Sequence, residues 1–302
     1  MKKPLRKIST RNSLSFLCVF LLSCGLIKAP QEFMSFTVSM EDPASHYYHV
    51  VFRYEGVKDE ELDFKMPAWT PGYYRILDFA KNVVRFKAQD GLGNELAWEK
   101  TSKNTWRVKT GKSKSVAVSY DVYAFEKSVA DSYLDESYAY ISPTSIFMHV
   151  SGKIARPVKI RVKPHHSFSQ ISTGLESVEG EPDTFFAPDF DTLYDCPIFI
   201  GNQQVFYFDV MGILHRVVVN EREEFDQEKM ASFLKKIVES AAALMGEIPY
   251  RHYTFIMMGE GQGGLNIRIR WLFSPESLIL KIQRPINAGC VLWLMNFFIS
   301  IM

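Results

Sequence analysis

The chain has 302 residues, of which 47% are hydrophobic and 14% aromatic. This length allows one large or two ordinary domains, and the composition excludes an intrinsically disordered protein. A formal net charge of +1 predicts no polyanionic partner, so a nucleic-acid-binding role is excluded as well.

Residues 1–29 have the layout of an export signal. A basic stretch between Lys2 and Arg11 precedes an apolar run over 14–27, which is too short to span a bilayer comfortably. Two endings remain open: residues 21–24 resemble a bacterial lipobox, which would leave Cys24 lipidated, whereas Ala29 would end an ordinary cleavage site. We favour the lipoprotein. We therefore expect a periplasmic or outer-membrane-associated protein that meets the membrane only through a lipid anchor or an uncleaved signal.

From Phe33 to about Val210, hydrophobic residues alternate with the period of two that is typical of strands. Clear examples are 36–40, 48–54 and 116–122, and the turn residues Asp90–Asn94 separate two further runs. Many short strands at this spacing predict an antiparallel β-sandwich. The expected fold class is therefore mainly β, with an N-terminal β domain over 33–210.

The pattern changes after residue 210. A further strand over 213–219 is followed by helical spacing of apolar residues over 226–245, which Gly246 ends, and then by a strand over 253–258. This order predicts the start of a mixed α/β domain near residue 211. Because little chain remains to cover it, we expect the apolar face of the helix to be partly exposed.

A GxGxxG match lies over 259–264, directly after the last predicted strand. A dinucleotide site would need a helix to begin here, so that its N-terminus faces the pyrophosphate. The following residues, Leu265 to Arg268, show no helical period. We therefore reject a nucleotide site.

Three other patterns have simple structural interpretations. The adjacent His165 and His166 do not share a strand or helix face, so a surface turn is expected. The acidic residues of 189–195 lack the spacing of a calcium loop and indicate a solvated turn. The aromatic segment 69–74 could be a carbohydrate-stacking patch, but a tight turn with core aromatics is the default expectation.

No HExxH, Cys-x-x-Cys or GxSxG motif occurs in the sequence, so motifs alone favour an exported binding module.

Four segments stand out in order along residues 33–265. They are Met66-Pro67-Ala68-Trp69-Thr70-Pro71-Gly72-Tyr73, Tyr133-Leu134-Asp135, Asp195-Cys196-Pro197-Ile198-Phe199-Ile200-Gly201, and Tyr253-Thr254-Phe255-Ile256 running into Gly261-Gln262-Gly263-Gly264-Leu265. Together these segments resemble the glycyl aminopeptidase family of zinc metallopeptidases. Phe199 departs from an acidic residue that many members have.

The resemblance implies an N-terminal β domain, a thermolysin-like catalytic domain that begins over 211–265, and often a PDZ domain. It implies zinc as the cofactor and peptide N-termini as the partners, with glycyl or alanyl substrates. Gly263, Gly264 and Leu265 would form the strand edge that lines the substrate cleft. In the family a Glu-His pair follows this edge, and an HExxH lies further on, whose two His bind zinc while the Glu acts as general base.

This chain departs from the family at residue 266, where Asn266 and Ile267 replace Glu-His. One lost base explains the change, because GAA-CAT without its G begins AAC-AT, which reads Asn-Ile. In the restored frame, each codon joins the last base of one printed codon to the first two bases of the next. Read in this way, codons 294–299 allow His-Glu-Phe-Phe-His. Glu is the only residue that the last base of Met295 and the first two bases of Asn296 can encode. We therefore hypothesise that 266–302 is an out-of-frame tail.

Two interpretations follow. The first is a truncated, inactive member of an exported zinc aminopeptidase family, with no catalytic residue, metal ligand or cofactor in this chain. The second is an exported β-sandwich binding module without peptidase function. A ligand for the isolated 33–210 segment would favour the second, whereas a restored reading frame would favour the first.

Overall fold

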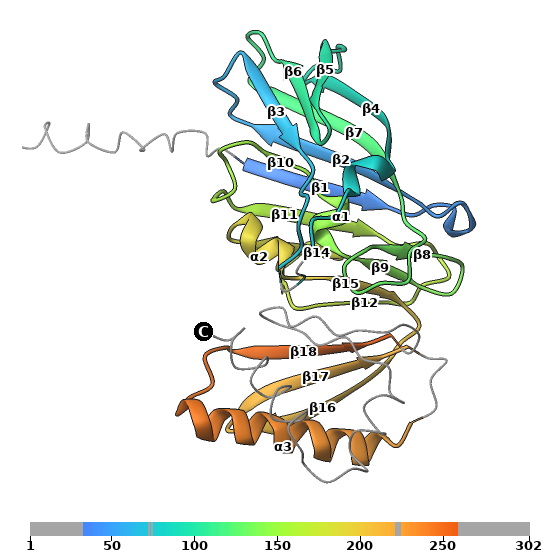
Figure 1. The fold of residues 1–302 in the computed structure, drawn as a ribbon, viewed down its shortest axis with the longest axis vertical. Helices are drawn as coiled ribbons and strands as arrows, with labels where there is room; N and C mark the ends of the chain where they lie inside the picture. The colour runs from blue at the N-terminus through green and yellow to red at the C-terminus, as the bar shows by residue number, and fades with distance from the viewer. Residues whose placement is uncertain (1–32, 72, 74, 221–224, 259–302) are drawn as a thin grey trace, which may run out of the picture. The chain divides into compact units, whose positions relative to one another are not determined.

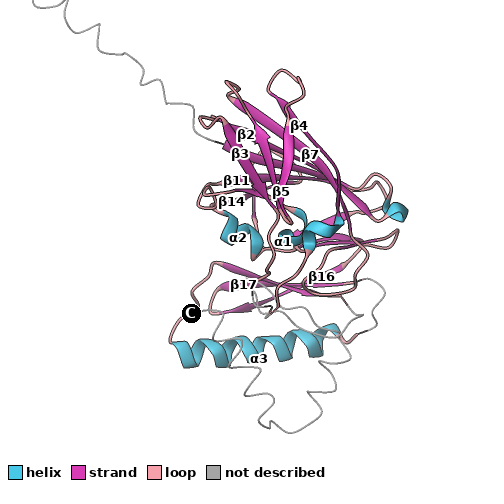
Figure 2. Ribbon diagram, turned by 45° about the horizontal axis from the view of Figure 1, so that its top comes forward, coloured by secondary structure: helices cyan, strands magenta, loops and turns pink. Residues whose placement is uncertain are grey.

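The computed structural model describes residues 33–71, 73, 75–220 and 225–258. Strands dominate this part of the chain, which confirms the predicted mainly β class (Figures 1 and 2). The predicted export signal with Cys24, the substrate edge Gly263–Leu265 and the tail 266–302 lie outside the described residues. Within the described part, no helix combines the length and hydropathy needed to cross a bilayer.

The largest sheet has seven strands in the order β13-β14-β11-β1-β2-β7-β4. Their bounds are Glu176–Ser177, Thr184–Ala187, Val158–Lys163, Phe33–Ser39, Tyr47–Glu55, Ser115–Tyr123 and Val83–Asp90. Alternation in β2 buries Tyr48, Val50, Phe52 and Tyr54 and turns the residues between them away from the core, as the sequence predicts. One pairing is not antiparallel: β1 and β11 run parallel, with Met34 opposite Val158.

A second sheet packs against the first across a shared core. It comprises β10 (His149–Val150), β3 (Glu61–Lys65), β6 (Thr105–Lys109) and β5 (Trp98–Ser102). Phe52 of β2 meets Phe64 of β3 edge-on at 5.5 Å between ring centroids, and Phe86 of β4 stacks on Trp106 of β6 at 5.6 Å. These contacts define the predicted sandwich.

A third sheet lies below this sandwich in Figure 1, in the order β12-β15-β9-β8. Its strands are Gln170–Thr173, Ile198–Gly201, Ala139–Ile141 and Tyr133–Leu134. Short helices α1 (Pro143–Ile146) and α2 (Phe190–Tyr194) and the 3-10 turns η1 (Pro43–Ser45) and η2 (Phe79–Asn82) complete this part of the fold.

The fourth sheet is the α/β unit that the sequence predicts. It contains β16 (Gln204–Val210), β17 (Ile213–Val219) and β18 (His252–Met257), and helix α3 (Gln227–Met245) lies along one face (Figure 2). β16 belongs to this sheet, so the change of sheet occurs at residues 202–203, between β15 and β16. The predicted division at 210/211 falls in the β16–β17 turn instead.

Local chemistry sets both ends of α3. The Asp226 carboxylate accepts a hydrogen bond from the Lys229 N–H at 2.9 Å, and Gly246 ends the helix with a φ of 83°. The buried side chains of the helix are Met230, Leu234, Ile237, Val238, Ala241 and Ala242. The expectation of a partly exposed apolar face holds in part, because Leu244 in the last turn is 73% exposed and Phe233 is only partly buried.

Candidate functional site

The strongest candidate site is the junction between the β8–β9 hairpin and strand β18. A hydrophobic cluster joins both elements, although they lie more than 100 positions apart in the chain. Its buried members are Tyr133, Tyr138, Tyr140, Phe199, Val218, Ile256 and Met258. β18 precedes Gly263, Gly264 and Leu265 in the sequence, for which the family resemblance implies the substrate edge. The junction therefore brings together three of the four segments that carry the family resemblance.

Asp135 holds the turn of the β8–β9 hairpin. Its carboxylate accepts hydrogen bonds from the Ser137 N–H at 2.7 Å, the Tyr138 N–H at 3.1 Å and the Tyr133 hydroxyl at 2.8 Å. The Ser137 hydroxyl donates to the same carboxylate. These donors fix the positions of both Tyr133 and Tyr138, whose rings contact each other at the junction with centroids 5.0 Å apart and planes tilted by 31°.

The hydrogen bonds outweigh the effect of burial on Asp135. Burial by itself raises the pKa of this carboxyl, but the donors on Ser137, Tyr133 and Tyr138 stabilise the charged form, and the pKa lies below its ordinary value. Asp135 is therefore ionised at neutral pH and acts as an acceptor. A general-acid role would need a raised pKa, so we assign it a positioning role.

Replacing Asp135 by asparagine should loosen the hairpin. An amide accepts through one oxygen. Because Oδ1 accepts three of the four hydrogen bonds and Oδ2 accepts one, at least the Tyr133 hydroxyl loses its acceptor. After allowance for partial exposure, we expect local opening to become easier by about 1–2 kcal/mol, which corresponds to roughly 5–30-fold faster amide exchange at Ser137 and Tyr138. Hydrogen exchange with mass-spectrometric readout measures this, and Glu136→Gln, at the exposed neighbour, is the matched control. Equal protection in both variants would contradict the assignment.

A cluster of buried hydroxyls ties this hairpin to the segment 69–74. Thr70 Oγ1 lies 2.6 Å from Thr144 Oγ1, and Ser132 Oγ lies 2.7 Å from Ser145 Oγ. The Ser142 N–H donates to Ser132 Oγ at 2.9 Å. Since every one of these groups is buried, each would be costly without its partner. The cluster therefore fixes how the two segments meet.

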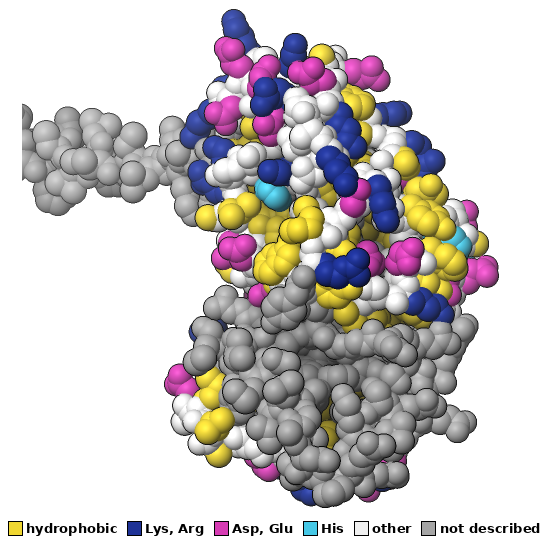
Figure 3. Space-filling view, in the orientation of Figure 1, with side chains coloured by type: hydrophobic (Ala, Val, Ile, Leu, Met, Phe, Trp, Pro, Cys, Tyr) yellow, Lys and Arg dark blue, Asp and Glu magenta, His cyan; other side chains and the backbone are white. Residues whose placement is uncertain are grey.

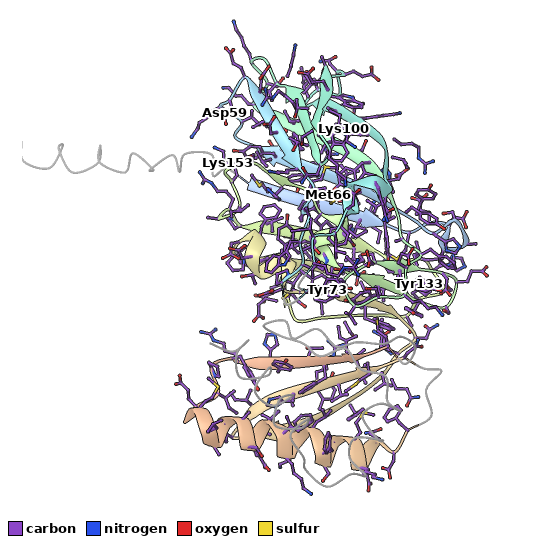
Figure 4. All side chains as sticks on the ribbon, in the orientation of Figure 1. Asp59, Met66, Tyr73, Lys100, Tyr133 and Lys153 are labelled. Atoms are coloured by element: carbon purple, nitrogen blue, oxygen red, sulfur yellow. The ribbon has the colours of Figure 1, made fainter. Side chains whose placement is uncertain are left out.

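The Tyr73 N–H donates to the Thr70 carbonyl at 3.0 Å, a hydrogen bond typical of the turn that the sequence predicts here. Tyr73 and Tyr133 are both labelled at the level of the third sheet (Figure 4). Trp69 is 49% exposed. Trp69 therefore lies at the surface, whereas the sequence led us to expect the aromatic residues of this turn to be in the core.

The other sequence patterns lie outside this junction. His165 and His166 form the expected turn, in which His165 Nδ1 lies 2.8 Å from Ser167 Oγ. Asp189 caps α2 by accepting from the Thr192 N–H at 2.7 Å. Asp189 and Asp195 lie at the two ends of the short helix α2, so the predicted solvated turn is wrong: Phe190, Leu193 and Tyr194 between them are buried.

No zinc site can be built from the residues the structure describes, because nowhere among them do three His, Cys, Asp or Glu side chains group as metal ligands. The junction has one ionised carboxylate, aromatic rings and hydroxyls. These groups can orient a neighbouring strand and exclude water. We derive no metal-dependent step from them.

Sequence reasoning missed both the Asp135 acceptor and the hydroxyl cluster. The only available signal was the run Ser142-Pro143-Thr144-Ser145, whose hydroxyls are buried although their residue types are usually exposed.

Comparison with known proteins identifies the family. The chain matches the Peptidase M61 N-terminal domain over residues 35–202 and belongs to that family. It therefore corresponds to the N-terminal part of a member of the M61 peptidase family, as the resemblance predicted.

Solved structures agree with this assignment. An aminopeptidase N family protein from Idiomarina loihiensis is 29% identical, with a TM-score of 0.78 over 89% of this chain and 47% of that one. The chain thus spans about half the length of that relative. Two structures of a mutant M1 zinc metallopeptidase from Deinococcus radiodurans, one bound to a Tyr-Ser-Ala substrate, share 11% and 12% identity and TM-scores of 0.50. They cover 82% and 81% of this chain and 60% of their own, and they show similarity of fold alone. Comparison with curated proteins gave no match.

Proposed function

We propose that this chain provides the N-terminal β domain and the beginning of the catalytic domain of an exported zinc aminopeptidase that removes glycine or alanine from peptide N-termini. The observation that carries the proposal is the family match over 35–202 together with the cluster that joins this domain to the end of β18. The basic and apolar pattern over 1–29 supports export, with Cys24 as the lipidation site.

Each region has a part in this function. The hairpin held by Asp135 positions β18, and β18 leads into Gly263, Gly264 and Leu265, which would line the cleft for the peptide N-terminus. Zinc in the family supplies an activated water. The printed sequence contains no HExxH and has Asn266-Ile267 in place of the family's Glu-His. We therefore propose that the 302 residues neither bind zinc at a defined site nor hydrolyse peptides.

The purified chain should release no p-nitroaniline above the blank from glycyl- or alanyl-p-nitroanilide, with or without added zinc. Its zinc content, measured by plasma mass spectrometry after dialysis, should be well below one ion per chain. Turnover that a chelator abolishes would contradict the proposal.

The frameshift hypothesis is tested at the DNA. Resequencing codons 260–302 and about 30 codons beyond should reveal an additional base that restores Gly-Gly-Leu-Glu-His and an HExxH. The restored product should hydrolyse both substrates, and a variant of it that lacks the HExxH glutamate should not. If the frame is confirmed and no HExxH follows in any frame, the exported β-sandwich binding module becomes the better function.

A further inference from the structure

Arg216 of β17 reaches from the α/β unit to the third sheet. Its side chain is partly buried, and its Nη2 donates to Ser172 Oγ of β12 at 3.0 Å. Within the described part of the chain, Arg216 makes no other hydrogen bond and no ion pair, and its buried Nε has no acceptor. A partly buried charge is costly when nothing neutralises it, so this guanidinium is suited to bind an anionic group.

A second buried side chain holds the same hydroxyl. Gln203, which is 3% exposed, donates from Nε2 to Ser172 Oγ at 2.9 Å. Its Oε1 has no hydrogen-bond partner among the described residues. Buried polar atoms without a partner are uncommon in folded proteins, and here two of them belong to side chains that meet at Ser172. The hydroxyl thus orients the guanidinium while most of its five N–H donors stay available.

Two cations of the sandwich show the usual arrangement. Arg107 donates to Asp63 through Nε at 2.7 Å and Nη2 at 2.9 Å, and Lys103 Nζ lies 2.7 Å from Asp78. In the view of Figure 3, Lys and Arg side chains intermingle with Asp and Glu side chains over the upper strands of the sandwich. Arg216 differs from these cations because no acid pairs with it in the described part of the chain.

Arg216 also lines a pocket of about 510 Å³, a volume typical of small-molecule sites. The rest of the lining comes from the segment 171–185, which runs from β12 through β13 to β14. Two hydroxyls of this segment are already used, because Thr173 donates to the Pro197 carbonyl and Thr184 to that of Pro182. The apolar side chains of the lining are Ile171, Leu175, Val178, Pro182 and Phe185.

Two acidic residues line the same pocket, and they differ in their pairing. Glu181 is neutralised by Lys159, whose Nζ lies 2.5 Å from its carboxylate. The Asp183 carboxylate makes no hydrogen bond or ion pair with any described residue. Its backbone is held in place, since the Val162 N–H donates to the Asp183 carbonyl at 2.9 Å. The described lining of the pocket therefore combines an apolar surface with one unpaired cation and one unpaired anion.

We propose that this pocket binds a zwitterion with an apolar body, either a free α-amino acid such as leucine or a short peptide that begins with one. Its carboxylate pairs with Arg216, its ammonium faces Asp183, and its side chain lies against the apolar lining. A simple anion would be repelled by Asp183 and a simple amine by Arg216, whereas a zwitterion complements both charges. The proposal goes beyond the proposed function, because binding needs neither zinc nor hydrolysis.

Calorimetry with the full chain compares ligands that lack one feature each. Leucine carries both charges, 4-methylpentanoate lacks the ammonium, 3-methylbutylamine lacks the carboxylate, and glycine lacks the apolar side chain. Leu-Gly-Gly is compared in the same way with its acetylated and its amidated forms. The intact zwitterion should bind about tenfold more tightly than each ligand that lacks a feature. Tighter binding of leucine identifies free amino acids as the source, and tighter binding of Leu-Gly-Gly identifies short peptides.

Variants at both charges locate the binding. Arg216→Gln should weaken binding of the zwitterion about tenfold, and Arg216→Lys, which keeps the charge but not the planar fork, should weaken it less. Asp183→Asn should weaken the zwitterion about fivefold and strengthen 4-methylpentanoate, because the repulsion of its carboxylate is removed. Asp183 has a φ of 55°, which asparagine tolerates, so the turn is kept. Arg53→Gln, at an exposed arginine of β2, is the matched control and should change nothing.

Opposite effects of Asp183→Asn on two ligands cannot come from a disturbed fold, so this variant tests the pocket even where Arg216→Gln lowers stability. If neither zwitterion binds, if the ligands with a single charge bind equally well, or if Arg216→Gln binds like the unchanged chain, the pocket is not a zwitterion site. An undiminished preference for the ammonium in Asp183→Asn would overturn the role assigned to Asp183.

Discussion

Replacing Phe52 by alanine should lower the free energy of unfolding of the β domain by about 3–5 kcal/mol. Phe52 has no exposed surface and lies at the centre of an aromatic group. Its ring stacks on Phe36 at 4.2 Å and meets Phe64 and Phe190 edge-on at 5.5 and 6.4 Å. Alanine removes these contacts and leaves a cavity that strands from two sheets would have to close, which a sandwich can do only in part.

Urea unfolding followed by near-ultraviolet circular dichroism measures this loss. Phe186→Ala is the matched control, because Phe186 on β14 is 38% exposed and its loss should cost less than about 1 kcal/mol. A similar loss of stability in both variants would show that Phe52 does not anchor the contact between the sheets.

The core around Phe52 could be predicted from the sequence because it follows from local periodicity. Alternation identifies Tyr48, Val50, Phe52 and Tyr54 as one face of a strand, whichever strands pair with it. Helix α3 is predictable for the same reason, since Asp226 and Gly246 mark its ends within its own sequence. Both elements depend on residues within a few positions of each other.

The parallel pairing of β1 with β11 could not be predicted in this way. Met34 and Val158 are opposite each other although 124 positions separate them, and no local pattern specifies that choice. The sequence placed β16 in the N-terminal β domain for a related reason. The alternation of β16 fits a strand of either domain, and its pairing with β17 places it in the sheet of the α/β unit. Tertiary pairing, and not propensity, determines both features.

The candidate site was predictable only through the family resemblance. Tyr133-Leu134-Asp135 and Tyr253-Thr254-Phe255-Ile256 stand out as segments, but their contact at the junction depends on the whole fold. The acceptor role of Asp135 depends on the turn that it closes, and a lone Asp in a loop gives no such signal. The ring contacts of His46 and Tyr47 with Tyr123 and Phe125 likewise exist only once β2 and β7 are paired.

His149 should make the β domain less stable as the pH falls from about 6.5 to about 4. Its side chain is largely buried, and its Nδ1 lies 2.9 Å from the Tyr194 hydroxyl. Burial, with a smaller contribution from the nearby positive charge of Lys65, lowers the pKa of His149 to about 4. In the unfolded chain the same imidazole has a pKa of about 6.5. Between these values the unfolded state binds a proton that the folded state does not.

Proton binding to the unfolded state favours unfolding, so this histidine costs nothing above pH 6.5 and about 3 kcal/mol once the pH reaches 4. Asp63, Asp90 and Asp135 have lowered pKa values, so their stabilising effect is lost as the pH falls below the ordinary carboxyl range. Burial also lowers the pKa of His215, which adds a penalty of the same sign as that of His149, so the comparison with His149→Asn isolates the part due to His149. Because an asparagine amide can occupy the position of Nδ1 beside Tyr194 without titrating, His149→Asn should remove the penalty. Its free energy of unfolding should therefore change less between pH 6.5 and 4.

Urea titrations at pH 7, 6, 5 and 4 measure the two slopes, and His166→Gln, at the exposed histidine of the β11 turn, is the control that should leave the slope unchanged. Parallel slopes for the unchanged chain and His149→Asn would mean that the folded protein protonates His149 readily. Opening of the contact between His149 and Tyr194 at acid pH would then be the simplest physical cause, and the Tyr194 ring would show it as a change in near-ultraviolet dichroism over the same range.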